Sequence, residues 1–153
     1  MNRPAAVFPG SFDPVTIGHV SIVKRALPLF SRIHVAIGSN SNKRSMFPVE
    51  QRLEWLRAAF ADEAHVEAVV FTGLTVDLCR ELGAAFILRG LRNSTDHGFE
   101  RSIALMNRAV GHIETIFLPA EPIHAHVSST IVRELIANKA DVSAFVPKGV
   151  IIP

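Results

Sequence analysis

The sequence is poor in cysteine, in aromatic residues and in net charge, and each shortage excludes a class of protein. Its single cysteine, Cys79, cannot form an intramolecular disulfide, which excludes disulfide-stapled secreted domains. Aromatic residues make up 7% of the chain and the net charge is only +2, which argues against nucleic-acid binding. No apolar run approaches the length of a membrane span, and no charged segment followed by a long apolar stretch opens the chain. We therefore expect a cytoplasmic protein that binds neither membrane nor nucleic acid.

Three common motifs are also missing. The chain has no Gly-x-Gly-x-x-Gly fingerprint, no Walker Gly-x-x-x-x-Gly-Lys and no Gly-x-Ser-x-Gly elbow. These absences argue against dehydrogenases and P-loop kinases, and they single out no nucleophile. With no repeat or low-complexity tract, 153 residues of which 48% are hydrophobic predict one domain over residues 1–153.

Strand-like and helix-like segments alternate along the chain. Short runs rich in Val, Ile and Phe predict five strands, at residues 5–8, 33–37, 66–71, 85–88 and 115–118. Between strands, apolar residues recur at helical spacing over residues 20–30, 49–60 and 99–110. This alternation indicates an α/β fold, namely a single-domain, Rossmann-like, doubly wound sheet of five parallel strands with flanking helices.

Individual residues mark helix ends and one apolar face. Pro48 suits the first position of a helix, Pro28 should kink or end the first helix early, and Ser128 or Ser129 can cap the last helix.

Apolar residues of the third helical segment share one face, which packs either on the sheet or on a neighbouring copy. They are Phe99, Ile103, Met106 and Val110.

Polar and basic residues follow the predicted strands, where an open parallel sheet binds its ligands. The segment 10–19 turns sharply into a helix whose free N–H groups suit an anion, and His19 lies in its first turn. Lys43 follows the second strand, and Arg89 and Arg92 follow the fourth. The guanidinium groups of the two arginines and the ammonium group of the lysine are both suited to binding phosphate. Although each segment alone also fits an ordinary loop, their convergence predicts a site for two phosphorylated ligands or one polyphosphate.

Several motifs on separate strand ends occur in one order. They are Phe8-Pro9-Gly10-Ser11-Phe12-Asp13-Pro14, Thr16-Ile17-Gly18-His19, Asn42-Lys43, Arg89-Gly90-Leu91-Arg92, Met106-Asn107-Arg108 and Val127-Ser128-Ser129-Thr130. Together they resemble the bacterial phosphopantetheine adenylyltransferase family of the nucleotidylyltransferase superfamily. The resemblance implies transfer of the adenylyl group of ATP to 4′-phosphopantetheine, with Mg²⁺ present and without a covalent enzyme intermediate, giving dephospho-coenzyme A and pyrophosphate. It also implies a homohexamer built as a dimer of trimers, with coenzyme A as a feedback ligand.

The resemblance assigns roles to individual residues as well. It implies that His19 is the catalytic residue and stabilises the transition state. Lys43 and Arg89 would hold the acceptor phosphate, with Ser11 and Thr75 also on the acceptor side. No protein ligand to a metal is expected. The expected ATP-binding residues are Ser11, Phe12, His19, Gly90, Leu91, Arg92, Glu100, His124, Ala125, His126, Val127, Ser128, Ser129 and Thr130.

The chain departs from the family pattern at a few positions, and other interpretations stay open. His124 stands where relatives usually have an aromatic residue, and Thr75 where some have Met. Residues 96–100 read Asp-His-Gly-Phe-Glu where relatives often read Asp-Phe-Glu-Tyr-Glu. The helix after Ser128 also fits an ordinary capped helix with Arg133 solvated. The alternative functions are another nucleotidylyltransferase, with nicotinate mononucleotide or a polyol phosphate as acceptor, and a noncatalytic nucleotide-binding module.

Overall fold

The chain is built on one sheet of five parallel strands. A computed structural model describes residues 2–39 and 44–153. Across the sheet the strands have the order β3-β2-β1-β4-β5, and every neighbouring pair is parallel. Their bounds are β1 Ala5–Gly10, β2 Arg32–Gly38, β3 Val66–Phe71, β4 Ala84–Leu91 and β5 Glu114–Pro119.

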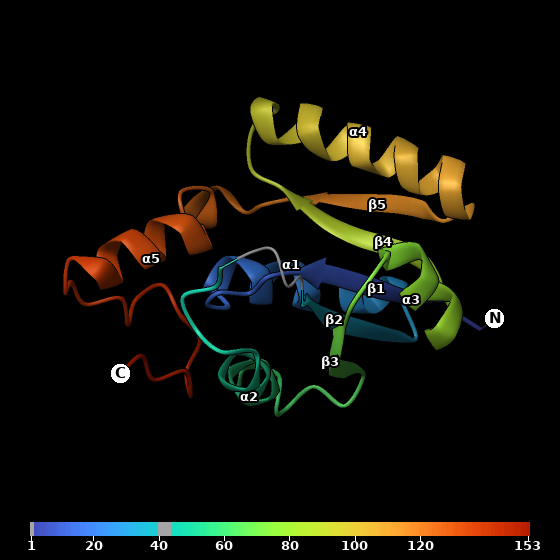
Figure 1. Cartoon of the computed structure of the whole chain (residues 1–153). Helices are drawn as coiled ribbons and strands as arrows, with labels where there is room; N and C mark the ends of the chain where they lie inside the picture. Colours follow the sequence, from blue (N-terminus) through green and yellow to red (C-terminus); the bar gives the residue numbers. More distant parts are fainter. Residues whose placement is uncertain (1, 40–43) are drawn as a thin grey trace.

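Helices cover both faces of the sheet, as the doubly wound fold requires. They are α1 Ile17–Ala26, α2 Val49–Ala59, α3 Thr75–Leu82, α4 Ser94–Gly111 and α5 Ser129–Ala137, with short 3-10 helices η1 Leu27–Leu29 and η2 Pro122–His124. Buried side chains of α1, α2 and α5 form one core cluster with the sheet, and those of α3 form a second. Figure 1 shows α4 lying along β5 and α5 beyond the end of the sheet toward which β1 points. The expected fold class is confirmed.

The strands and helix ends agree closely with the sequence pattern, with one difference. Pro28 lies in η1, directly after α1 ends, because a ring without an N–H cannot continue the helix. Ser128 is the N-cap of α5, where its side chain accepts the Ile131 N–H at 3.2 Å. Pro48 was expected as the first residue of a helix, but it is the N-cap of α2, with an extended ψ of 152°.

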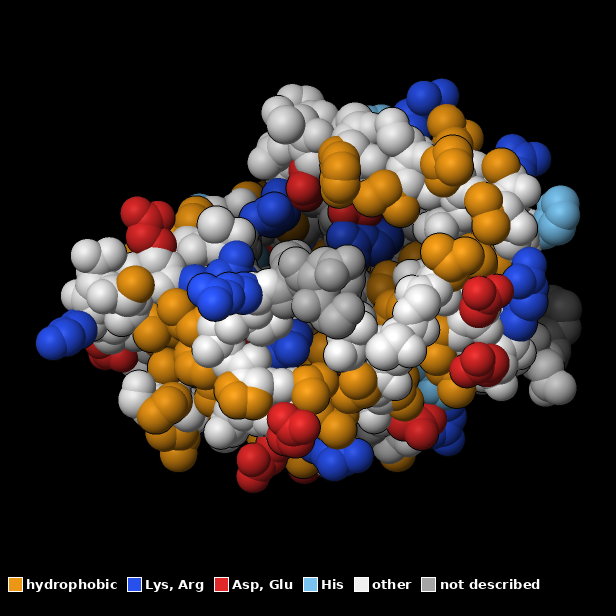
Figure 2. All heavy atoms as spheres, viewed as in Figure 1, with side chains coloured by type: hydrophobic (Ala, Val, Ile, Leu, Met, Phe, Trp, Pro, Cys, Tyr) orange, Lys and Arg blue, Asp and Glu red, His pale blue; other side chains and the backbone are white. Residues whose placement is uncertain are grey.

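The apolar face of α4 is exposed rather than packed on the sheet. Phe99 is 67% exposed, Met106 62% and Val110 54%. Figure 2 shows orange side chains gathered over this part of the surface. In the part of the chain that the structure describes, no strand packs against this apolar face of α4. None of the helices in these ranges is both long and apolar enough to cross a membrane.

The order of the strands creates a point of divergence at the centre of the sheet. The chain leaves β1 for α1 on one face, whereas it leaves the adjacent strand β4 for α4 on the other. Connections that depart in opposite directions leave a crevice at the carboxyl ends of the two strands. The segments after β1 and β4 therefore meet where a ligand site is expected.

Candidate active site

Two cavities of about 280 Å³ each open at the carboxyl ends of β1 and β4. We name them the His19 cavity and the Thr75 cavity, after a residue that lines only one of them. In Figure 2 a hollow on this face has Lys and Arg side chains around it. The two cavities share one wall, which consists of Pro9, Gly10, Ser11, Arg89 and Glu100.

The turn after β1 is fixed by buried polar groups. The Asp13 side chain accepts the backbone N–H of Met46 at 2.8 Å and that of Phe47 at 3.0 Å, although Asp13 is only 5% exposed. Arg52, also buried, donates to the Ser11 carbonyl at 2.7 Å and to the Phe47 carbonyl at 3.0 Å. These bonds tie the turn to the start of α2, so its backbone is held in place before any ligand binds.

Phe12 supports this turn from the core side. Its φ of 45° is left-handed, a conformation that costs a non-glycine residue energy and persists only when the surroundings impose it. The ring is 1% exposed and packs edge-on against Phe8 and against His19, with ring centroids 4.9 Å apart for the second pair. Phe12 therefore lines the His19 cavity mainly as packing behind the imidazole.

His19 is held in one orientation and one protonation state. The backbone N–H of Thr16 donates to His19 Nδ1 at 3.0 Å, while the Thr16 hydroxyl accepts the His19 backbone N–H at 3.4 Å, a reciprocal helix cap. A nitrogen that accepts carries no proton, so the proton lies on Nε2. Burial, then the guanidinium groups of Arg89 and Arg92, lower the pKa of His19 from 6.5 to about 3. Near neutral pH His19 is thus an uncharged Nε2–H donor.

Two arginines at the end of β4 are paired with carboxylates of α4. Arg89 donates to both oxygens of Glu100, at 2.8 Å from Nε and 2.5 Å from Nη2. Arg92 Nη2 lies 3.4 Å from Asp96, whose other oxygen accepts the Arg92 backbone N–H. Arg92 and Asp96 line only the His19 cavity. Because α4 carries both carboxylates, it fixes where the two guanidinium groups stand.

The start of α5 closes the far side of the His19 cavity. Ser129 Oγ donates to the Pro14 carbonyl at 2.8 Å, and Arg133 Nη1 donates to the Asp13 carbonyl at 2.9 Å. Arg133 is half-buried and lines the cavity, so the interpretation of it as a solvated surface residue is wrong. Its spacing of four residues from Ser129, which puts both on one helix face, could have identified it.

The structure brings most of the expected site residues together. Of the expected ATP-binding set, the residues that line the His19 cavity are Ser11, Phe12, His19, Gly90, Arg92, Glu100, His124, Val127, Ser128, Ser129 and Thr130. On the acceptor side, Ser11, Thr75 and Arg89 line the Thr75 cavity. The cavity walls do not include Leu91, Ala125 or His126. Lys43 lies outside the described residues.

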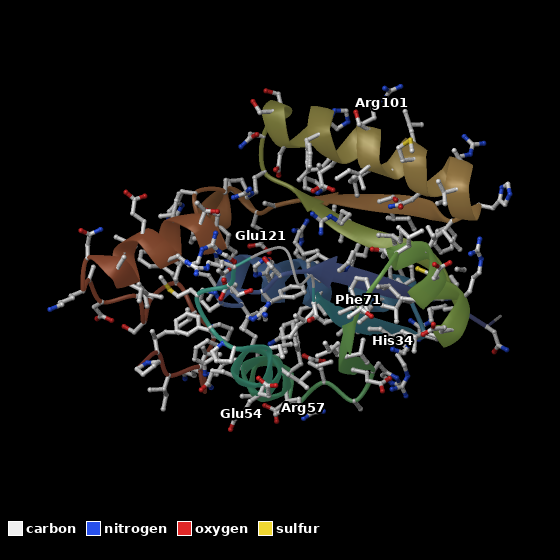
Figure 3. The ribbon with its side chains drawn as sticks, in the orientation of Figure 1. His34, Glu54, Arg57, Phe71, Arg101 and Glu121 are labelled. Carbon is white, nitrogen blue, oxygen red and sulfur yellow. The ribbon has the colours of Figure 1, made fainter. Side chains whose placement is uncertain are left out.

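Residues to which the sequence assigned no ligand-binding role complete the Thr75 cavity. Phe71, at the end of β3, is one of them and is labelled in Figure 3. Asn107 on α4 and Thr115 on β5 add polar groups, beside the apolar Ile103 and Ala104. Thr115 Oγ1 is buried without a hydrogen-bond partner in the described chain, as is His124 Nδ1 at the His19 cavity. Both atoms are buried, with almost no surface exposed to the cavities.

Neither cavity contains a ready set of metal ligands. In the described residues no group of three or more His, Cys, Asp or Glu side chains is placed to hold a metal ion. The two carboxylates that line the His19 cavity, Asp96 and Glu100, are engaged with arginines. The described site therefore does not fit an ion held by the protein alone.

Several known proteins similar to this chain share one name. The cytidylyltransferase-like family matches residues 7–135. A protein named phosphopantetheine adenylyltransferase from Flavobacterium psychrophilum is 50% identical to this chain, over 95% of the chain and 96% of the relative. One of the same name from Bacteroides fragilis is 46% identical, over 94% of the chain and 96% of the relative. A protein of the same name from Limosilactobacillus reuteri is 41% identical over 95% of this chain and 84% of the relative.

Proposed function

We infer the reaction from one premise: the chain belongs to the phosphopantetheine adenylyltransferase family, within the cytidylyltransferase-like proteins. It is a nucleotidyltransferase of coenzyme A biosynthesis that transfers the adenylyl group of ATP to 4′-phosphopantetheine. The products are dephospho-coenzyme A and pyrophosphate. The steps proposed below concern how the residues of the two cavities carry out this transfer.

ATP binds in the His19 cavity, with its phosphates toward His19 and Arg92. Charge spreads over the phosphoryl oxygens as the acceptor phosphate attacks the α-phosphorus in line and pyrophosphate leaves. The fixed Nε2–H of His19 donates to one of these oxygens, and it needs no reorientation because Thr16 already holds the ring. Because the low pKa leaves His19 uncharged in the free protein, we propose that it contributes a hydrogen bond rather than a proton to the transfer. No covalent enzyme intermediate is needed.

4′-Phosphopantetheine binds in the Thr75 cavity, with its phosphate at the shared wall. Arg89 holds that phosphate, because its guanidinium stands in the wall and faces both cavities. The amide-bearing arm of the acceptor suits the remaining lining, where Asn107 offers hydrogen bonds beside apolar side chains. Lys43 is proposed to assist Arg89 on the basis of the family resemblance alone.

We propose that Mg²⁺, when present, would be held by the phosphates of ATP rather than by side chains of the described site. This proposal is supported by the pairing of Asp96 and Glu100 with arginines, which leaves the ion to the phosphate oxygens and water that it prefers. When bound, Mg²⁺ neutralises part of the charge on the triphosphate. Every step assigned to the protein above is carried by its own residues.

The single observation that carries this mechanism is the shared wall of the two cavities. Two ligands that meet at Ser11 and Arg89 can react directly, as a transfer without a covalent enzyme intermediate requires. Pyrophosphate release from ATP, measured with 4′-phosphopantetheine, nicotinate mononucleotide and glycerol 3-phosphate in turn, tests the function. We expect release with the first only. ATP binding without release on any acceptor would favour a noncatalytic module.

We also propose a homohexamer, located in the cytoplasm, with coenzyme A as a feedback ligand in the substrate site. The exposed apolar residues of α4, among them Phe99 and Met106, support an assembly, because soluble monomers rarely expose a continuous patch of this kind. Light scattering coupled to size-exclusion chromatography tests the assembly. The expected mass is six times the 16.7 kDa of one chain.

A further inference from the structure

Glu100 is a buried carboxylate whose two oxygens both serve Arg89. Arg89 donates from Nε and from Nη2 to opposite oxygens of the carboxylate, and the Glu100 side chain is only 6% exposed. A buried negative charge repels a polyphosphate, and both Glu100 oxygens are already used. Contact between Glu100 and the phosphates of ATP therefore fits this geometry poorly.

Arg89 is held at a third point as well. Its Nη1 donates to the carbonyl of Pro9, on the neighbouring strand β1. An arginine carries five N–H donors, and in the described chain these three bonds leave one N–H on each Nη. Two such donors match two oxygens of one phosphate group. The fork is thus prepared for phosphate before any ligand binds.

We propose that Glu100 is a positioning residue for the transfer: it sets the rotation of the Arg89 guanidinium, so that its two remaining donors meet the acceptor phosphate in line with ATP. This inference rests on the proposed function of Arg89 as a ligand of that phosphate. The negative charge of Glu100 by itself weakens the attraction of Arg89 for an anion. The benefit of pairing Glu100 with Arg89 must therefore lie in the orientation of the guanidinium, because in-line transfer is highly sensitive to the placement of the reacting groups.

Helix α4 provides the rigid support that this role requires. Its first turn is fixed by the Asn93 side chain, which accepts the Asp96 N–H at 2.8 Å, and by the pairing of Asp96 with Arg92. Glu100 follows about one turn later and points inward. Its neighbour Arg101 is exposed and points away from the sheet (Figure 3), which makes it a matched control on the same helix.

The test compares Glu100→Gln, Glu100→Asp, Arg89→Ala, the double variant Glu100→Gln with Arg89→Ala, and the control Arg101→Gln, all on the full chain. Glu100→Gln keeps the shape of the side chain but replaces one acceptor with a donor. We expect it to lower kcat at saturating substrates at least about tenfold, with the KM for ATP changed by less than about twofold. Glu100→Asp keeps the charge yet withdraws the carboxylate, and we expect it to lower kcat similarly. Arg101→Gln should match the wild type.

The double variant decides whether Glu100 acts through Arg89. Once Arg89 is absent, Glu100→Gln should change kcat by less than about twofold, whereas additive losses would overturn the proposal. A raised KM for ATP with unchanged kcat, or full kcat in Glu100→Asp, would also overturn it. Calorimetry with 4′-phosphopantetheine and pantetheine separates this failure from that of the proposed function. If Arg89→Ala leaves the affinity ratio of these two ligands unchanged, Arg89 does not hold the acceptor phosphate, and both proposals fall.

Discussion

Replacing His19 separates its catalytic role from its structural one. His19→Ala removes both the Nε2–H donor and the Nδ1 acceptor of the Thr16 N–H. His19→Asn removes only the first, because Oδ1 of asparagine is as many bonds from Cα as Nδ1 is. Loss of one preorganised donor to a transition-state oxygen costs about 10²- to 10³-fold in kcat, and we expect this loss in both variants.

The stabilities of the two variants should differ. Loss of the bond from the Thr16 N–H to Nδ1 in His19→Ala should lower the free energy of unfolding by about 1 kcal/mol, while His19→Asn keeps this bond and most of that stability. For a domain of this size, 1 kcal/mol corresponds to roughly 2–4 °C in Tm, which calorimetry resolves. Steady-state release of pyrophosphate gives kcat. The reasoning is refuted if His19→Asn keeps kcat near that of the wild type, or if both variants melt at the same temperature.

Other substitutions test the pKa, the turn, the packing of β4 and the face of α4. Because folding depresses the pKa of His19 from 6.5 to about 3, the free energy of unfolding should be greatest above pH 6.5 and fall as the pH drops below it. Between pH 7 and pH 5, urea unfolding should show that the wild type loses about 2 kcal/mol more of this free energy than His19→Asn does. Asp13→Asn should destabilise the chain by about 1–3 kcal/mol in the same assay at pH 7, because an amide oxygen and NH₂ cannot accept both N–H groups at the start of α2. Gly90→Ala places a methyl group 3.1 Å from Ile22 and should cost about 1–3 kcal/mol, whereas Gly98→Ala meets no atom within 4 Å and should stabilise α4 by roughly 0.5–1 kcal/mol; thermal melts compare them. Met106→Glu should reduce the mass seen by light scattering, and an unchanged mass would exclude this face from the assembly.

The sequence predicted the fold well because its signals are local and repeated. The strands are short apolar runs containing Val, Ile or Phe, and Pro28 and Ser128 mark helix ends without any tertiary information. The convergence of His19 with Arg89 and Arg92 was also predictable, since parallel strands place their carboxyl ends at one edge.

The sequence pattern does not reveal which distant residues form hydrogen bonds with one another. The bonds from Asp13 to the start of α2 join residues more than 30 positions apart, and the tautomer of His19 depends on a backbone N–H that no motif reveals. Arg133 was ambiguous because a basic residue one turn into a helix is usually solvated. For Glu100, sequence position alone does not say that Arg89 occupies both of its oxygens.

The common wall of the two cavities also has a consequence for inhibitor design. A compound that joins a fragment for the Thr75 cavity to one for the His19 cavity would cross the wall beside Ser11 and Arg89. Because the same five residues line both cavities, we expect a short linker to be sufficient, and the second fragment then binds at a high effective concentration. The Asp13 bonds that fix this turn would reduce the reorganisation needed for such a ligand. The junction of the two cavities is therefore the point from which to grow a linked inhibitor.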